Sequence, residues 1–200
     1  IGRTAEAIGL LEAAVKLRPE AAELWLALAN ASFRRAELGE ALNWLDKGQA
    51  AAGPQAGFFI TRASVLVMKG DITKARDALV DGIAQAPTSQ RGLIWKALGD
   101  LYQARGDLLS ARAAFQQWAE DQPENPDPRI ALVLLAIEAK DEPGIEKAIK
   151  AVENVTGARG YYWRYARVED LLRDHPDAKG PEAVASRLKE AEALIAEIRQ

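Results

Sequence analysis

Cysteine is absent from this 200-residue chain, and histidine occurs only once. Without cysteine the chain can form neither a disulfide nor a thiolate nucleophile, and a zinc site built on cysteine is excluded. A chain without cysteine functions in reducing and in oxidising surroundings alike. Cytoplasmic and periplasmic locations therefore both remain open.

Long apolar runs and blocks of like charge are absent as well. The longest strongly apolar stretch runs from Ile130 to Ile137, whereas a helix that spans a membrane needs about 20 residues. The net charge is −3, and no run of five like charges occurs. Because surfaces that bind nucleic acid are usually basic, we expect no nucleic-acid partner. Because the longest apolar stretch is too short, we expect no membrane span.

What the sequence does contain is a repeat with a period close to 34 residues. Small or apolar residues recur at steps of 34, 34, 36 and 34, at Ala7, Ala41, Ala75, Ala111 and Ile145. Each unit holds two amphipathic segments whose apolar residues lie three and four positions apart, as in a helix. No segment shows the sustained alternation of a strand. The repeat therefore predicts an all-α chain of helix-turn-helix units.

Glycine and aspartate mark the short turns inside these units. Gly39, Gly70 and Gly106 are predicted to lie just past a helix end, where a left-handed backbone favours glycine. Asp71 and Asp107 follow directly and suit the N-terminal cap of the next helix.

The third unit carries a set of residues with a known order and spacing. These residues are Trp95, Leu98, Gly99, Tyr102, Ala111, Phe115 and Pro123. With them the chain resembles the tetratricopeptide repeat (TPR) family, and the resemblance extends over nearly its whole length. It implies a right-handed superhelical solenoid of stacked antiparallel helix-turn-helix hairpins, in which small residues allow close helix contacts and large residues fill the gaps.

The period divides residues 1–200 as a single array. We expect repeats at 22–54, 56–89 and 92–125, a degenerate repeat at 126–159, and a longer terminal hairpin at 160–200. Residues 1–20 are expected to be the second helix of a truncated repeat. Terminal repeats normally carry a polar outer face, which is not evident on the final helix. We therefore expect a fragment of a larger bacterial TPR-containing protein, able to self-associate through its uncapped ends.

No constellation typical of an enzyme is present. The one histidine, His175, stands beside Asp174 and Asp177, but a solvated turn explains this segment better than a metal site. No glycine-rich loop follows a strand, as a nucleotide site requires. We therefore predict no catalytic residue, no metal and no other cofactor.

The resemblance also implies where a protein or peptide partner binds, because repeats of this family typically bind such partners on a concave face lined by the first helix of each unit. The candidates are the positions on these helices outside the packing signature. They are Leu26, Asn30, Phe33, Arg34, Ile60, Ser64, Val67, Met68, Lys96, Asp100, Gln103, Ile130, Leu134, Tyr161 and Arg164. Such a mixed groove suits a segment with a few apolar anchors, bound as a helix or as an extended peptide.

Two finer interpretations of these positions are disfavoured. Some members of the family clamp a C-terminal carboxylate with basic residues, but Leu26 and Ile60 stand where a charge would be expected. Tyr161 and Arg164 belong to an aromatic segment that could form a stacking platform for a ligand. Packing is the favoured interpretation of that segment, because successive helical positions point in different directions.

The leading hypothesis is thus a non-catalytic scaffold for protein–protein interaction. Two alternatives remain open at this stage. The chain could be a regulatory or substrate-presenting arm of an enzyme whose catalytic domain lies elsewhere, or an assembly or secretion component of a bacterial envelope system.

Overall fold

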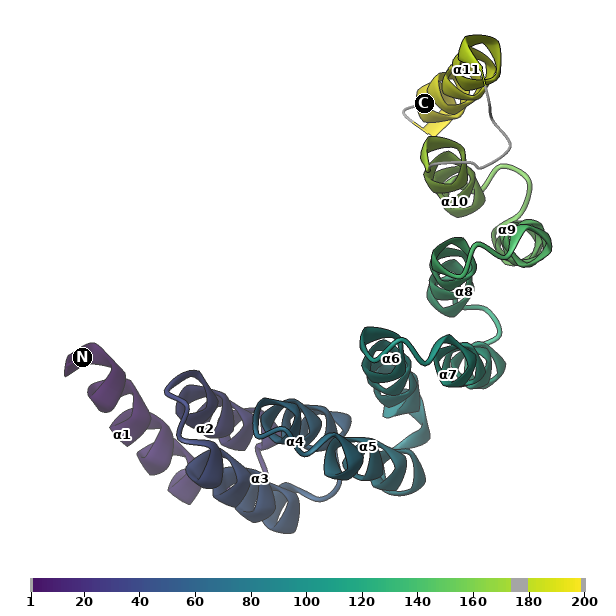
Figure 1. Cartoon of the computed structure of the whole chain (residues 1–200). Coiled ribbons are helices and arrows are strands. Elements are labelled where there is room, and N and C mark those ends of the chain that lie inside the picture. The colour runs from purple at the N-terminus through teal and green to yellow at the C-terminus, as the bar shows by residue number, and fades with distance from the viewer. Residues whose placement is uncertain (1, 174–179, 199–200) are drawn as a thin grey trace. The chain divides into compact units, whose positions relative to one another are not determined.

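The computed structural model describes residues 2–173 and 180–198, and every regular element in these ranges is an α-helix (Figure 1). The all-α fold class is therefore confirmed. The helices are α1 (Gly2–Leu17), α2 (Ala22–Arg34), α3 (Leu38–Ala52), α4 (Ala56–Met68), α5 (Ile72–Gln85), α6 (Thr88–Ala104), α7 (Leu108–Asp121), α8 (Asp127–Glu138), α9 (Glu142–Thr156), α10 (Tyr161–Leu172) and α11 (Pro181–Ile198). Their contacts divide the chain into two compact units, Ile1–Leu101 and Tyr102–Gln200. The division into repeats of one array stays a prediction.

The first unit buries a core that no single hairpin could form. Ala29 of α2, Leu45 of α3 and Phe58 of α4 make one cluster, and all three are fully buried. The first helix of the second hairpin, α4, therefore completes the core of the hairpin before it. This is the stacking that a helical repeat needs, because each unit alone leaves an apolar face open.

Two glycines on second helices allow large aromatic side chains to lie close to the backbone. A Cβ atom on Gly48 of α3 would lie 2.6 Å from Cβ of Trp25 on α2. A Cβ atom on Gly82 of α5 would lie 2.7 Å from Cγ of Phe59 on α4. In both hairpins, therefore, a side chain is missing where an aromatic residue of the first helix needs the room.

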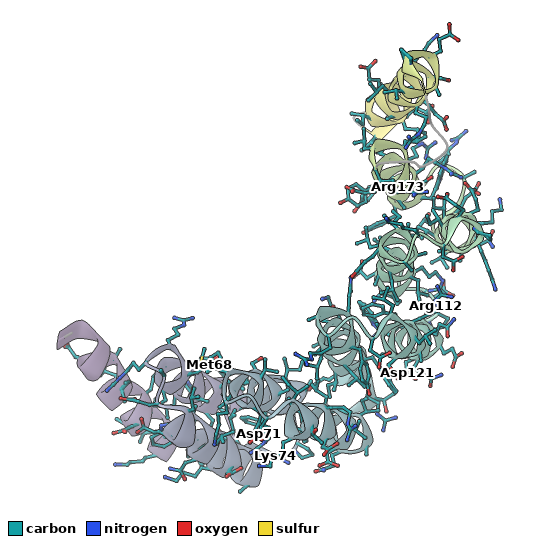
Figure 2. All side chains as sticks on the ribbon, in the orientation of Figure 1. Met68, Asp71, Lys74, Arg112, Asp121 and Arg173 are labelled. Atoms are coloured by element: carbon teal, nitrogen blue, oxygen red, sulfur yellow. The ribbon has the colours of Figure 1, made fainter. Side chains whose placement is uncertain are left out.

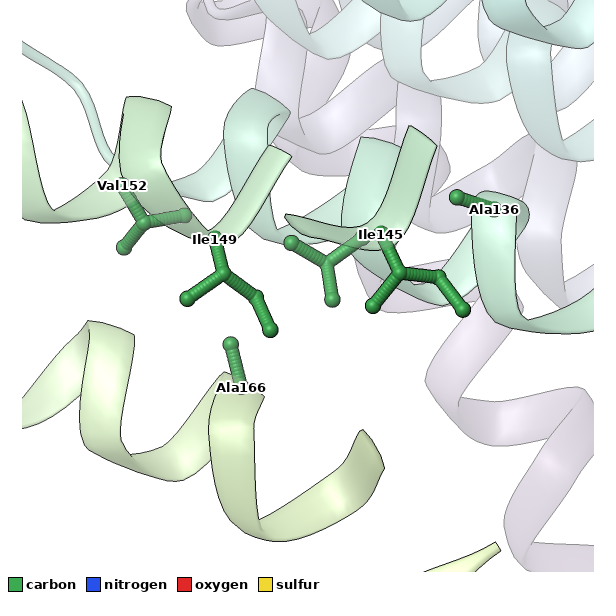
Figure 3. Close-up of a cluster of buried hydrophobic side chains, with 6 residues drawn as sticks. Ala136, Ile145, Ile149, Val152 and Ala166 are labelled. Atoms are coloured by element: carbon green, nitrogen blue, oxygen red, sulfur yellow. The ribbon is translucent and has the colours of Figure 1, made fainter. Parts of the chain in front are cut away.

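The second unit has a core of its own, built on α8, α9 and α10. Figure 3 shows Ile145 and Ile149 of α9 lying close to Ala136 of α8 and Ala166 of α10. Val152 extends the same buried row along α9. The two alanines on the neighbouring helices leave room for the branched side chains of α9, which is how residues of different size fill a close-packed core.

One residue with a left-handed backbone stands in the turn inside each of four hairpins. These residues are Ala36 (φ 59°), Gly70 (φ 82°), Gly106 (φ 74°) and Lys140 (φ 54°). The predictions for Gly70 and Gly106 are confirmed, but the prediction for Gly39 is wrong. Because α3 begins at Leu38, Gly39 lies inside that helix, and Ala36 makes the turn instead.

The two predicted aspartate caps differ. The carboxylate of Asp107 accepts a hydrogen bond from the backbone N–H of Ser110 at 3.1 Å, so this cap is confirmed. Asp71 also stands at the N-cap position of its helix, but its side chain caps no backbone N–H. Its carboxylate accepts from Lys74 at 3.1 Å instead, at the turn that both labels mark in Figure 2.

Candidate functional site

An apolar groove of about 480 Å³ lies on the first unit. It gathers six of the residues that the sequence singled out, namely Phe33, Ile60, Ser64, Val67, Met68 and Asp100. The other lining residues are Ala63, Leu79, Ala97 and Leu101. Four helices, α2, α4, α5 and α6, therefore contribute to one surface.

Helix α4 forms the long wall of this groove. Ile60, Ser64, Val67 and Met68 follow one another at steps of three and four residues or as neighbours, so they lie on one side of the helix. Val67 and Met68 are exposed by 41% and 56%, and Met68 is labelled in Figure 2. Large apolar side chains with this much exposure form an apolar surface that a binding partner could bury.

Helix α6 forms another wall, and a polar contact ties its start to α4. The side-chain oxygen of Gln90 accepts from the backbone N–H of Ala56 at 2.8 Å, and its amide donates to Gln55 at 2.7 Å. Ile94 and Leu98 are buried. This arrangement presents Ala97, Asp100 and Leu101 to the groove.

The remaining predicted residues of the first unit lie elsewhere. Lys96 donates to the carboxylate of Asp100 at 2.7 Å, on the same helix. Leu26 is half-buried against the core cluster of α2, α3 and α4. Asn30 and Arg34 line a separate hollow of about 680 Å³, together with residues of α1 such as Ile8 and Leu11.

The predicted residues of the second unit differ in their surroundings. The amide of Gln103 donates to the carboxylate of Glu138 at 2.5 Å. Ile130 packs against the core of this unit, and Leu134 is exposed by 41%. A small hollow of about 160 Å³ lies among Arg112, Leu132, Lys147 and neighbouring residues, none of which is a predicted partner-binding residue.

The aromatic segment at the start of α10 is engaged largely within its own unit. The rings of Tyr161 and Tyr162 stack with their centres 4.0 Å apart, and a hydrogen bond to Tyr162 raises the pKa of Tyr161. The guanidinium of Arg164 lies 4.7 Å from the ring centre of Trp163 and donates to the carboxylate of Glu197 at 2.7 Å. These contacts favour packing over a platform for a ligand.

The described residues bring no set of metal-binding side chains together. Within residues 2–173 and 180–198, no group of three or more His, Cys, Asp or Glu side chains is placed to hold a metal ion. The segment with His175, Asp174 and Asp177 lies outside the described residues. The pKa of Asp141, the N-cap residue of α9, is lowered first by a hydrogen bond from Arg112 and then by one from the backbone N–H of Gly144.

Two further observations concern membranes and self-association. Among the described helices, none combines the length and the apolar character that crossing a membrane requires. Leu10 on α1 and Val184 and Leu188 on α11 are exposed large apolar side chains. Self-association through these helices stays a prediction.

Comparison with known proteins agrees with the hairpin architecture. Two family models, both described as tetratricopeptide repeat, match residues 2–57 and residues 60–126. The chain belongs to the tetratricopeptide repeat family. Proteins of this family are generally non-catalytic scaffolds that bind protein or peptide partners. No curated protein matches the sequence significantly.

Solved structures of TPR proteins show the same fold. YrrB, described as a TPR protein with an unusual peptide-binding site, is 16% identical with a TM-score of 0.52, over 92% of this chain and 91% of its own. MamA is 18% identical with a TM-score of 0.53, over 88% and 90%. A TPR protein from Parabacteroides merdae is 15% identical with a TM-score of 0.56, over 99% and 72%. At these identities the likeness concerns the fold alone.

Proposed function

We propose that this chain is a non-catalytic scaffold that binds a segment of a partner protein in the apolar groove of the first unit. One observation carries the proposal. Six residues, chosen from the sequence because they stand on first helices outside the packing signature, line a single groove of about 480 Å³. Pockets of this size commonly hold ligands, and convergent side chains from several helices are what a binding site requires.

The dimensions of the groove indicate how much of a partner it holds. Residues Ile60 to Met68 of α4 cover about two helical turns, or roughly 12 Å at a rise of about 1.5 Å per residue. Such a length accommodates two or three apolar side chains of a short helix or of an extended peptide. The expected ligand is therefore a short segment with a few apolar anchors rather than a folded domain.

The test compares two valines that are similarly exposed. Peptides would be selected from a displayed library on the folded chain, and their affinities measured by fluorescence anisotropy. We expect Val67→Gln to weaken binding about tenfold, because an uncharged amide then faces the apolar anchors of the peptide and loses its hydrogen bonds to water.

Val80→Gln is the matched control, since Val80 lies on α5, is 49% exposed and does not line the groove. It should leave affinity unchanged. Circular dichroism would establish that both variants stay folded. Equal affinities of both variants and the parent chain would overturn the proposed site.

A further inference from the structure

The groove has few polar groups, and only one of them carries a charge, which is negative. Of its ten lining residues, Asp100 carries the only charge and Ser64 the only other polar side chain. The hydroxyl of Ser64 donates to the backbone carbonyl of Ile60 at 3.0 Å, within its own helix. A segment that enters the groove therefore meets apolar side chains and one carboxylate.

The carboxylate of Asp100 can exchange its present partner for another. Lys96 holds one of its oxygens at 2.7 Å, and the two side chains are 52% and 51% exposed. An ion pair this exposed is weak, because water screens the two charges and holding the side chains together costs conformational entropy. A carboxylate also accepts from more than one donor, so a cation of the partner can join or replace Lys96.

Occupation of the groove makes this charge more important. An apolar segment lying between α4 and α6 displaces water from the surroundings of Asp100. In the lower effective dielectric constant that results, an opposite charge is attracted more strongly and a like charge is repelled more strongly. A negatively charged segment or a C-terminal carboxylate is therefore disfavoured at this position.

We propose that the groove selects apolar segments that carry a lysine or arginine beside their apolar anchors, with the cation bound to Asp100. This inference rests on the proposed function and names the class of segment that the groove takes. Arginine is expected to bind better than lysine, because its planar guanidinium can bind a carboxylate through two parallel hydrogen bonds. The apolar contacts supply the affinity, and Asp100 supplies the choice between charges.

The test begins with two displayed libraries of 12-residue peptides. Both contain every apolar residue, but one supplies Lys and Arg as its charged residues and the other supplies Asp and Glu. Selection on the folded chain should enrich binders from the basic library. Enrichment from the acidic library alone would overturn the inference.

A double-mutant cycle then locates the cation. Replacing the basic residue of a selected peptide with alanine should weaken binding to the parent chain about three- to tenfold. The same replacement in the peptide should hardly change its binding to the Asp100→Asn variant, because that variant has already lost the interaction with the cation. Lys96→Ala should strengthen the binding of the basic peptide, since it removes the cation that competes for Asp100. Asp77→Asn, a charge removal on α5 outside the groove, is the matched control and should change nothing.

Failure of the inference and failure of the proposed function give different results. If peptides bind, Val67→Gln weakens binding and Asp100→Asn shows no coupling to the basic residue, the groove is the site but Asp100 does not select the charge. If neither library yields peptides that are sensitive to Val67→Gln, the proposed function itself fails. Only coupling to Asp100 together with sensitivity to Val67→Gln supports both.

Discussion

Glycine fills one position of the repeat in two hairpins, and tryptophan fills it in the next. Gly48 and Gly82 lie beneath Trp25 and Phe59, whereas the corresponding residue of α7 is the buried Trp118. The 34-residue period identifies these as equivalent positions. It does not show how close the facing helices come, and this distance decides whether a side chain fits.

Gly82→Ala should destabilise the chain, although alanine favours helices more than glycine does. The gain in helix propensity is about 1 kcal/mol. The new Cβ would lie 2.7 and 2.8 Å from Cγ and Cβ of Phe59, and Cβ cannot move away without the backbone. Overpacking of this kind costs about 1–3 kcal/mol, so we expect a net loss of about 1 kcal/mol, measured by urea unfolding.

Gly9→Ala supplies the control for this prediction. Gly9 is likewise within a helix, but apart from its chain neighbours and the backbone of its own helix no described atom lies within 4 Å of the position that its Cβ would take. This variant should gain up to about 1 kcal/mol from helix propensity alone. A Gly82→Ala variant that gains as much as Gly9→Ala would contradict the tight contact with Phe59.

At the scale of the helices, the sequence predicts the elements well and the turns less well. The apolar period of three and four residues marks the helices because burial of one face requires it. The turn before α3 carries no such mark. Its left-handed residue is Ala36, and alanine has no special preference for that backbone conformation. The turn was therefore predicted at the nearby Gly39 instead.

Ala36→Gly should stabilise the first hairpin. A left-handed backbone costs a non-glycine residue about 1–2 kcal/mol, so glycine at this position relieves that cost. Glycine is also more flexible in the unfolded chain, which lowers the stability of the folded state by about 0.5–1 kcal/mol. We expect a net stabilisation of about 0.5–1 kcal/mol, measured by thermal unfolding. Gly39→Ala, inside α3 with free space around its Cβ, should not destabilise the chain. Loss of stability in both variants would show that Gly39, not Ala36, makes the turn.

The groove was predicted in part, for a related reason. Most of its wall on α4 consists of residues outside the packing signature that the period identifies. Ala63, Leu79, Ala97 and Leu101 also line it, but their apolar side chains could not be told from core residues in the sequence. In the second unit, Gln103 and Arg164 bind carboxylates of their own chain. Sequence spacing does not show which polar side chains already have partners.

At the scale of the whole molecule, the chain consists of two compact units whose boundary, Leu101–Tyr102, falls inside α6. Each described core cluster lies within one unit, on α2–α4 in the first and on α8–α10 in the second. In repeat proteins, stability arises from each unit and its nearest neighbours. A local change in packing should therefore affect mainly its own unit.

Hydrogen exchange of the backbone amides tests this expectation with a pair of variants. Gly48→Val places a branched side chain against Trp25 and Phe58 in the first unit, and Ala166→Leu overfills a site in the second that is 1% exposed. Each should cost about 1–3 kcal/mol, which accelerates exchange through opening about tenfold per 1.4 kcal/mol. Gly48→Val should accelerate exchange in α2–α5 and leave α8–α10 protected, and Ala166→Leu should do the reverse. Equal acceleration in both units by either variant would show that they open as one cooperative body, because a purely local opening cannot expose amides in the other unit.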